Sequence, residues 1–380
     1  MIVEKLSNDL DQERCLKELG VDAGGIKILA SKMRTNIISI KQLHVGAANI
    51  LKQDALSIGA DLAVPRGTVV AKELYVDCVL IANEKQLRTL SKKELSQPFS
   101  LKELALSLEK ILQAKYPLKH EIMGVINANE DSFYQGSRFQ GIDALQKIEK
   151  MIEEGADIID IGGVSSRPNA PLVNASEEMQ RVKPIMDAIS SSRLYERAQF
   201  SIDSYDPVVV RYALDSGFSI VNDITGLSND TICSLCAEYD ASAVIMHMQG
   251  TPQTMQKNPY YENVLDDVYS FFNKRIQKAE SFGVKDIVLD VGIGFGKTLE
   301  HNLFLLKNLE HFLTLQKRVL VGASRKSMID MIVKSDIDKR LAGTLTLHLE
   351  ALKNGASIVR VHDVSEHYQA IKVFEALKNS

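Results

Sequence analysis

Carboxylate, carboxamide and cationic residues follow a series of short apolar segments in the C-terminal two thirds of the chain. Asp203, Asn222 and Asp290 stand directly on such segments, where a buried carboxylate without a partner would be costly. Residues of this kind persist where a partner or a ligand compensates them. The general polarity of loops explains the serines and glycines nearby, but it explains these three residues less well, so we interpret them as functional.

The residue types indicate a ligand with two unlike ends. Two carboxylates and a carboxamide can accept several N–H donors, and an aminopyrimidinone ring such as that of a pterin offers such a donor edge. Positive charge follows the last two apolar segments, at Arg325, Lys326, Arg360 and His362. These cations suit a phosphate group. The sequence therefore predicts one site with an acceptor-rich part and a cationic part.

The apolar segments repeat eight times from His120 onward, and each is followed by a longer amphipathic stretch. They are EIMGVIN (121–127), DIIDIGG (157–163), QFSIDS (199–204), SIVNDI (219–224), SAVIMHM (242–248), DIVLDVG (286–292), RVLVGAS (318–324) and SIVRVHD (357–363). Nearly continuous apolar runs are typical of parallel strands covered on both faces. Four of the helical stretches end in a glycine suited to a helix C-cap: Gly155, Gly217, Gly283 and Gly355.

Eight strand–helix units over residues 120–380 predict an eight-stranded parallel TIM barrel, with a doubly wound open sheet as the alternative. A TIM barrel carries its active site at the carboxyl ends of the strands, where the polar residues stand.

Residues 1–115 lack this repeat and predict a small separate α/β domain of unknown role, joined through AKYPLKH (114–120). We expect strands at IKILAS (26–31), NIISI (36–40), ADLAVP (60–65) and DCVLIAN (77–83). Helices are expected at ANILKQDALSIG (48–59) and SLKELALSLEKILQ (100–113), the second with Ser100 as its N-cap.

Composition excludes several classes of protein. The net charge of −4 argues against nucleic acid or an anionic membrane as the main partner. No signal peptide or membrane-spanning segment is evident, so we expect a cytoplasmic protein. The four cysteines, Cys15, Cys78, Cys233 and Cys236, are too few for a disulfide scaffold. The C-x-x-C pair lies in a helix-like segment without further metal ligands, and we expect buried thiols.

The glycine-rich segment GIGFGKT (292–298) looks like a phosphate-binding loop but does not fit either nucleotide pattern. The Walker pattern requires glycine where Val291 stands, and G-x-G-x-x-G requires glycine where Lys297 stands. We therefore expect no nucleotide at this segment.

Eight motifs in order closely resemble the dihydropteroate synthase family over about residues 120–375. They are IMGVINANEDSF (122–133), DIIDIGGVSSRPN (157–169), SIDSY (201–205), NDITG (222–226), MHMQGTPQTMQ (246–256), LDVGIGFGKT (289–298), VGASRKS (321–327) and IVRVHD (358–363). The resemblance implies a transferase of folate biosynthesis that joins p-aminobenzoate to a dihydropterin pyrophosphate and releases pyrophosphate, by an SN1-like course. It also implies Mg²⁺, a homodimer and inhibition by sulfonamides.

The resemblance also assigns residues, position by position. The pterin positions are Asp203, Asn222, Met246, Asp290, Gly322, Lys326 and Arg360. The p-aminobenzoate positions are Ser166, Arg167, Pro168, Phe295 and Ser327, and the pyrophosphate positions are Asn127, Ser166, Arg360 and His362. Asn127 is the implied metal ligand. The implied catalytic residues are Asp131, which would stabilise a cation, and Asp203, Lys326 and Arg360.

Two other functions would share the pterin acceptors. One is a pterin-binding methyltransferase barrel that works with a corrinoid partner, although it has no use for pyrophosphate ligands. The other is a catalytically silent paralogue that binds pterin. The chain departs from the family pattern in its loops, with ANED (128–131) for VTPD, Val164 for Glu and Asn169 for Gly. Val291 stands where the family commonly has Pro.

Overall fold

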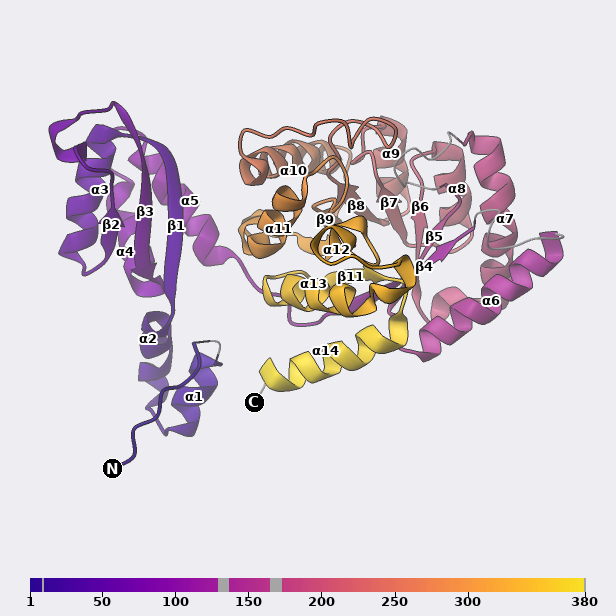
Figure 1. Cartoon of the computed structure of the whole chain (residues 1–380), viewed down its shortest axis with the longest axis horizontal. Helices are drawn as coiled ribbons and strands as arrows, with labels where there is room; N and C mark the ends of the chain where they lie inside the picture. Colours follow the sequence, from indigo (N-terminus) through magenta and orange to yellow (C-terminus); the bar gives the residue numbers. More distant parts are fainter. Residues whose placement is uncertain (9, 129–136, 165–172, 379–380) are drawn as a thin grey trace. The chain divides into compact units, whose positions relative to one another are not determined.

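The chain forms two compact units, Met1–Ala114 together with Glu375–Ser380, and Lys115–Phe374. The computed structural model describes residues 1–8, 10–128, 137–164 and 173–378. Figure 1 shows the course of the chain and the element labels used below.

The second unit is a closed barrel of parallel strands in the order β10-β11-β4-β5-β6-β7-β8-β9. The strands are β4 Glu121–Asn127, β5 Ile158–Gly162, β6 Gln199–Asp203, β7 Ile220–Asp223, β8 Ser242–Met246, β9 Ile287–Asp290, β10 Arg318–Val321 and β11 Ile358–Val361. Each coincides with one of the eight apolar segments, so the TIM barrel is confirmed and the open sheet is excluded. The strands are buried along most of their length, which explains why their sequences do not alternate.

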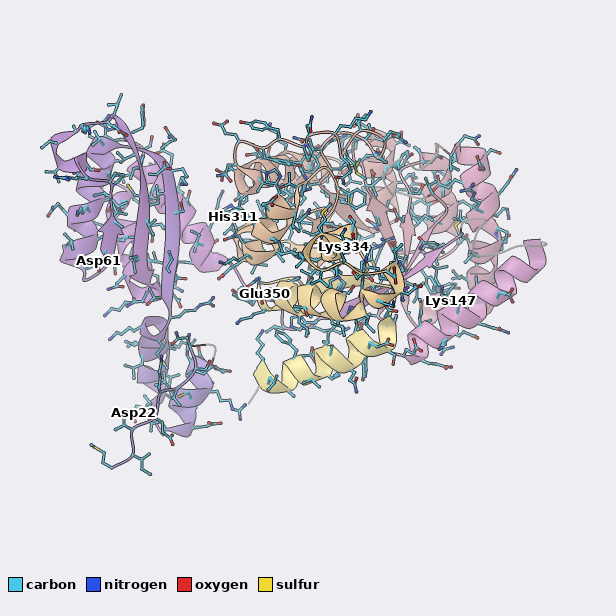
Figure 2. The ribbon with its side chains drawn as sticks, in the orientation of Figure 1. Asp22, Asp61, Lys147, His311, Lys334 and Glu350 are labelled. Carbon is cyan, nitrogen blue, oxygen red and sulfur yellow. The ribbon has the colours of Figure 1, made fainter. Side chains whose placement is uncertain are left out.

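Helices surround the barrel, in the connections between strands and after the last strand (Figure 1). They are α6 Ser137–Glu153, α7 Ala175–Ser192, α8 Pro207–Asp215, α9 Asp230–Glu238, α10 Val264–Ser281, α11 Leu299–Lys307, α12 Ser327–Ile332, α13 Leu341–Lys353 and α14 Val364–Lys378. Short 3₁₀ helices are η2 Leu194–Glu196, η3 Leu309–Leu315 and η4 Ile337–Lys339. Exposed charged side chains such as Lys147 on α6 and Glu350 on α13 project from the helices (Figure 2).

The four glycines expected at helix ends all adopt the left-handed conformation that a C-cap needs. Gly155 has φ +103° and Gly355 has φ +104°. The chain turns there into β5 and β11, respectively. The left-handed region is open to glycine at little cost, so these positions confirm the prediction.

Seven of the eight strands contribute to one apolar cluster inside the barrel. Its members, each at most 2% exposed, are Met123, Ile158, Ile220, Val244, Val288, Leu320 and Ile358. The barrel is therefore a packed core rather than a channel, and chemistry has room only at an end.

The first unit contains a three-stranded antiparallel sheet in the order β1-β3-β2. The strands are β1 Thr35–His44, β2 Asp61–Ala63 and β3 Tyr75–Asn83, and the helices are α1 Gln12–Glu18, α2 Ala23–Met33, α3 Val45–Ser57, α4 Glu84–Glu94 and α5 Leu101–Gln113, with a 3₁₀ turn η1 at Thr68–Val70. Residues of the sheet and of α3, α4 and α5 share one apolar core. The small α/β class is confirmed.

Two expectations for this unit are wrong. Residues 26–31 belong to α2 rather than to a strand, and only Ile26 of that helix is buried. A short apolar run fits either element when nothing local decides between them. Ser100 precedes α5 but has φ +64° and makes no side-chain cap, because a capping side chain needs an extended backbone at that residue. Helix α4 was not expected, although Asn83 and Gln86 form a capping box.

Candidate active site

The polar side chains of the site lie one layer above the apolar cluster of the barrel. Successive strand residues point to opposite faces, so a residue two positions after an inward-facing one also points inward, nearer the carboxyl end. Five of the expected pterin residues follow a cluster member at this spacing: Asn222 after Ile220, Met246 after Val244, Asp290 after Val288, Gly322 after Leu320 and Arg360 after Ile358. Asp203 follows the fully buried Ser201 in the same way.

Asp160 occupies the same layer, two positions after Ile158, and sequence reasoning missed it. The residues at the very ends of the apolar segments drew attention, whereas Asp160 lies inside its segment. The two-residue period would have found it, because a carboxylate on the inward face of a buried strand needs a partner. Its residue exposure is 0%.

Arg360 on β11 bridges Asp160 on β5 and Asp203 on the neighbouring strand β6. These three residues with Asn222 form what we call the carboxylate cluster. The Arg360 Nε atom donates to Asp160 Oδ2 at 2.6 Å, and its Nη2 atom donates to Asp203 Oδ2 at 2.8 Å. Asn222 Nδ2 donates to Asp160 Oδ2 at 3.2 Å. Asp160 Oδ1 is buried and has no hydrogen-bond partner among the described residues, which leaves an acceptor in this layer.

The charges of the carboxylate cluster alter one another. Burial raises the pKa of Asp203 to about 7, although the Arg360 charge opposes this rise. Burial alone would lower the pKa of Arg360, but Asp160 and Asp203 outweigh that effect and raise it. Arg360 therefore stays charged, while Asp203 can change its protonation near neutral pH.

A second group, which we call the lysine cluster, consists of Asp290, Phe295, Lys297 and Lys326 with His247. Asp290 Oδ1 accepts a hydrogen bond from Gly292 N at 2.8 Å. Lys326 Nζ lies 4.6 Å from the centre of the Phe295 ring and donates to the Ile293 carbonyl. Burial lowers the pKa of Lys326 to about 8 despite the Asp290 charge. Burial likewise raises the pKa of Asp290, against the charge of Lys326.

Lys297 is the buried centre of the loop after β9, and it was not expected to have a role. Its Nζ atom lies 2.9 Å from His247 Nδ1, 3.2 Å from His247 O, 3.1 Å from Gly292 O and 3.0 Å from Phe295 O. Burial lowers its pKa to about 7, with Asp290 acting in the opposite direction. Burial and the Lys297 charge lower the pKa of His247 to about 2, so this imidazole is a neutral acceptor.

The glycines of GIGFGKT allow the loop after β9 to pack closely against the backbone after β8. A Cβ atom on Gly292 would lie 1.9 Å from the His247 carbonyl oxygen, and one on Gly296 would lie 2.4 Å from the Gln249 carbonyl oxygen. Both residues have positive φ, +64° and +63°. The glycine pattern therefore has a packing cause, which agrees with the expectation that it is not a nucleotide loop.

The ends of β10 and β11 are also joined. Ser324 Oγ lies 2.9 Å from His362 Nδ1 and accepts from His362 N at 3.3 Å. Arg325 Nε donates to Asp363 Oδ2 at 3.1 Å. Arg325, which follows a strand end in the sequence, is thus paired with a carboxylate of the next strand end.

The structure describes two of the remaining expected residues, Asn127 and Ser327. Asn127 is the last residue of β4 and is half-buried, and Ser327 is the exposed first residue of α12. The expected catalytic residue Asp131 and the expected p-aminobenzoate residues Ser166, Arg167 and Pro168 lie outside the described residues.

Cys233 and Cys236 are free and fully buried on α9, as expected for ordinary thiols. Burial raises the pKa of Cys236 to about 12. In the part of the chain that the structure describes, no helix is both long enough and apolar enough to cross a membrane.

Known proteins resemble this chain in sequence. A family model described as "Pterin binding enzyme" matches residues 123–362. A bifunctional dihydropteroate synthase/dihydropteroate reductase of Helicobacter pylori is 43% identical over 380 residues, which is 100% of both chains. The dihydropteroate synthase of Escherichia coli is 41% identical over 258 residues, covering 67% of this chain and 90% of its own length.

Solved structures resemble the barrel. A Yersinia pestis dihydropteroate synthase in complex with a sulfonamide drug has a TM-score of 0.64 and 34% identity, covering 69% of this chain and 95% of its own. A Thermus thermophilus dihydropteroate synthase in complex with 4-aminobenzoate has a TM-score of 0.62 and 37% identity, covering 68% and 95%, respectively.

Proposed function

This chain belongs to the pterin-binding enzyme family, as a dihydropteroate synthase, and on that premise we propose how its barrel carries out the reaction. The reaction joins the amine of p-aminobenzoate to the methylene carbon of dihydropterin pyrophosphate. The bond between that carbon and the pyrophosphate oxygen breaks, and its electron pair leaves with the pyrophosphate. The amine lone pair forms the new C–N bond, and the amine then loses a proton.

The pterin ring lies in the layer above the apolar cluster in this proposal. Asp203, Asn222 and Asp290 accept hydrogen bonds from its N–H groups, and Lys326 donates to its acceptors. Met246 and Gly322 border the ring, and Gly322 has no side chain to fill the space. The buried charges are held in place before substrate arrives, so little reorganisation is needed during the reaction.

Arg360 covers the ring and reaches the pyrophosphate, together with Asn127 and His362. Stabilising the charge that develops on the leaving group lowers the barrier, and fixed cations can do so in a water-poor site. Carboxylates nearby, Asp203 among them, favour the positive charge that develops on carbon in an SN1-like course.

The residues present fit a magnesium ion that takes only part of its ligands from protein. The Asn127 carboxamide at the end of β4 is an oxygen ligand of the kind Mg²⁺ binds, and Mg²⁺ often keeps several waters and binds substrate phosphates. Among the described residues no group of three His, Cys, Asp or Glu side chains could hold a metal. When bound, Mg²⁺ would neutralise charge on the departing pyrophosphate.

p-Aminobenzoate lies against Phe295 and Ser327 in this proposal, with Ser166, Arg167 and Pro168 of the loop after β5. An aromatic amine is already nucleophilic and needs positioning more than activation. Asp131 is proposed to stabilise the cation. We also propose a cytoplasmic homodimer, which a mass measurement in solution would test.

The observation that carries the proposal is the bridge from Arg360 to Asp160 and Asp203, in the same layer as Asp290, whose charge interacts with that of Lys326. Purified protein with Mg²⁺, dihydropterin pyrophosphate and p-aminobenzoate should produce dihydropteroate and pyrophosphate, and a sulfonamide should inhibit it. Pterin binding without any product would favour the silent paralogue. Transfer of a methyl group to a corrinoid would favour the methyltransferase barrel.

We propose dihydropteroate reductase as a second activity, located in the N-terminal unit. The Helicobacter relative whose name includes this activity matches all 380 residues, whereas the Escherichia coli synthase matches 67% of the chain. A cavity of about 1040 Å³ in this unit is lined by α1, α2 and α4. Five cations line it against two carboxylates: Lys27, Lys85, Arg88, Lys92 and Lys93 against Glu13 and Glu84. Such a surface suits a phosphorylated reductant such as a reduced nicotinamide nucleotide.

The reductase is tested with dihydropteroate and either NADH or NADPH, by following nicotinamide oxidation and the reduced pteroate. The double variant Lys27→Glu/Lys92→Glu should lower this activity at least about tenfold and leave synthase activity within about twofold, because neither lysine belongs to the compact unit that carries the proposed synthase residues. Absence of oxidation with both nucleotides would remove a nicotinamide-dependent reductase from consideration.

A further inference from the structure

Two buried histidines that the proposed mechanism does not use lie behind the last two strand ends. His348 is on α13 and His367 is on α14, and each is 1% exposed. Their rings are in contact, with centroids 5.0 Å apart. A buried imidazole pair needs defined hydrogen bonds, because an unpaired ring nitrogen would be costly there.

The hydrogen bonds form a chain of three links. Ala323 N donates to His348 Nε2 at 3.0 Å. His348 Nδ1 lies 2.9 Å from His367 Nε2, and His367 Nδ1 lies 2.5 Å from the Asp363 carbonyl oxygen.

The direction of every link follows from its first donor. A backbone N–H can only donate, so His348 Nε2 carries no proton and a neutral His348 donates from Nδ1. His367 Nε2 then accepts, and its Nδ1–H donates to the Asp363 carbonyl. Both imidazoles are therefore neutral, each as the Nδ1–H tautomer.

These hydrogen bonds connect the two strand ends that carry the proposed cationic ligands. Ala323 stands between Gly322 and the segment Ser324–Lys326, and Asp363 directly follows His362. The loop after β10 also bonds to α13 through Arg325 N, which donates to Thr344 Oγ1 at 3.0 Å. The Arg325–Asp363 ion pair joins the same two ends but is partly exposed, at 30% and 15% of side-chain area, and water screens it more than the buried imidazoles.

We propose that His348 and His367 are positioning residues for the synthase reaction, holding the loop that carries Lys326 against the strand end that carries His362. Neither touches substrate. The proposal rests on the synthase function proposed above. It predicts that the pair controls affinity for the pyrophosphate-bearing substrate more than for p-aminobenzoate.

Protonation of His348 would break its hydrogen bond with Ala323, because the Nε2–H group would then face the N–H group of Ala323. Burial keeps the pKa of His348 well below the ordinary value, and His367, Lys326 and His362 act in the same direction because each is a positive charge when protonated. Burial also lowers the pKa of His367, whereas Asp363 and Glu366 oppose that shift. The arrangement should therefore hold at neutral pH and fail only on acidification.

The test compares two substitutions at one position. His348→Leu removes both hydrogen bonds with little loss of volume. His348→Gln can accept from Ala323 N and donate to His367 Nε2, and it does not titrate. His311→Leu is the matched control, a half-buried histidine on η3 whose pKa burial also lowers and which the mechanism does not use.

Steady-state KM values for both substrates, melting temperatures and pH profiles are measured on the full chain. His348→Leu should raise the KM for dihydropterin pyrophosphate about tenfold, as expected when a buried backbone N–H loses its acceptor, with the KM for p-aminobenzoate within about twofold. His348→Gln should restore the wild-type KM to within about threefold at neutral pH. On acidification the KM of the wild type should rise more steeply than that of His348→Gln, which keeps Asp203 but lacks the imidazole.

An equal rise in both KM values in His348→Leu, with a lower melting temperature, would assign the pair to packing and overturn the proposal. A His348→Gln enzyme no better than His348→Leu would overturn it as well. If the wild type makes no dihydropteroate, the synthase proposal fails separately. Calorimetric binding of dihydropterin pyrophosphate and of 6-hydroxymethylpterin then gives the same comparison without turnover, and equal losses for both ligands would contradict the positioning role.

Discussion

The carboxylate cluster and the lysine cluster are close enough for their charges to interact, yet different parts of the chain hold them. In the carboxylate cluster, side chains on β5, β6, β7 and β11 bond to one another. In the lysine cluster, the two ammonium groups bond mainly to backbone carbonyls of the loop after β9. The first cluster should therefore depend on the identity of its side chains, and the second also on the path of a glycine-rich backbone.

The largest effect is expected at Asp203 of the carboxylate cluster. Asp203→Ala removes a proposed pterin acceptor and one of the two carboxylates that compensate buried Arg360, so kcat/KM should fall about a hundred- to a thousandfold. Pyrophosphate release measures this loss. Asp215→Ala, at an exposed position on α8, is the control and should stay near wild type. A loss of less than about tenfold for Asp203→Ala would contradict the proposed role of the carboxylate cluster.

The next effect is expected at Asp290, the acidic member of the lysine cluster. Asp290→Ala should abolish pterin binding measured by calorimetry, because it removes an acceptor and leaves Lys326 without its neutralising charge. Asp286→Ala is a matched control, since Asp286 directly precedes the first residue of the same strand and bonds to Arg318 and Ser242. Unchanged affinity in Asp290→Ala would show that the pterin acceptors lie elsewhere.

Substitutions at two glycines with positive φ, Gly292 and Gly294, test how tightly the backbone of the lysine cluster is packed. Gly292→Ala should lower the free energy of unfolding by about 3 kcal/mol or more, since its Cβ would meet a carbonyl oxygen at 1.9 Å. Gly294→Ala should cost only about 1 kcal/mol, because the nearest atom belongs to the flexible Lys326 side chain at 3.2 Å. Denaturant unfolding measures both values. Equal losses in the two variants would contradict the conclusion that close packing against the His247 carbonyl requires glycine at position 292.

The smallest effect is a dependence on pH that involves both clusters. Asp203 loses its negative charge as pH falls below about 7, and Lys326 loses its positive charge as pH rises above about 8. The profile of kcat/KM should therefore peak between these values and fall up to about tenfold per pH unit outside them. Lys326→Arg should lack the alkaline limb. If that limb is unchanged, another group causes it.

Sequence reasoning succeeded where a local pattern has one physical cause. Continuous apolar runs required strands buried on both faces, and the glycines before four of the strands required left-handed backbone. It failed at residues 26–31, because a six-residue apolar run fits a helix or a strand equally well. It also missed Asp160, although the alternation of strand residues would have placed it beside Asn222 in the layer above the apolar cluster.

By itself, the sequence determined the positions of the eight strands and the polar residues that end them. Each of these features depends on neighbours within a few positions in the sequence. Only the tertiary structure decided which charges pair. Arg360 lies 200 positions from Asp160 and 157 from Asp203, and closure of the barrel brings them together. The same holds for the contacts of Lys297 and for the tautomers of His348 and His367. Those follow from hydrogen-bond partners on separate helices and loops, which no local pattern can identify.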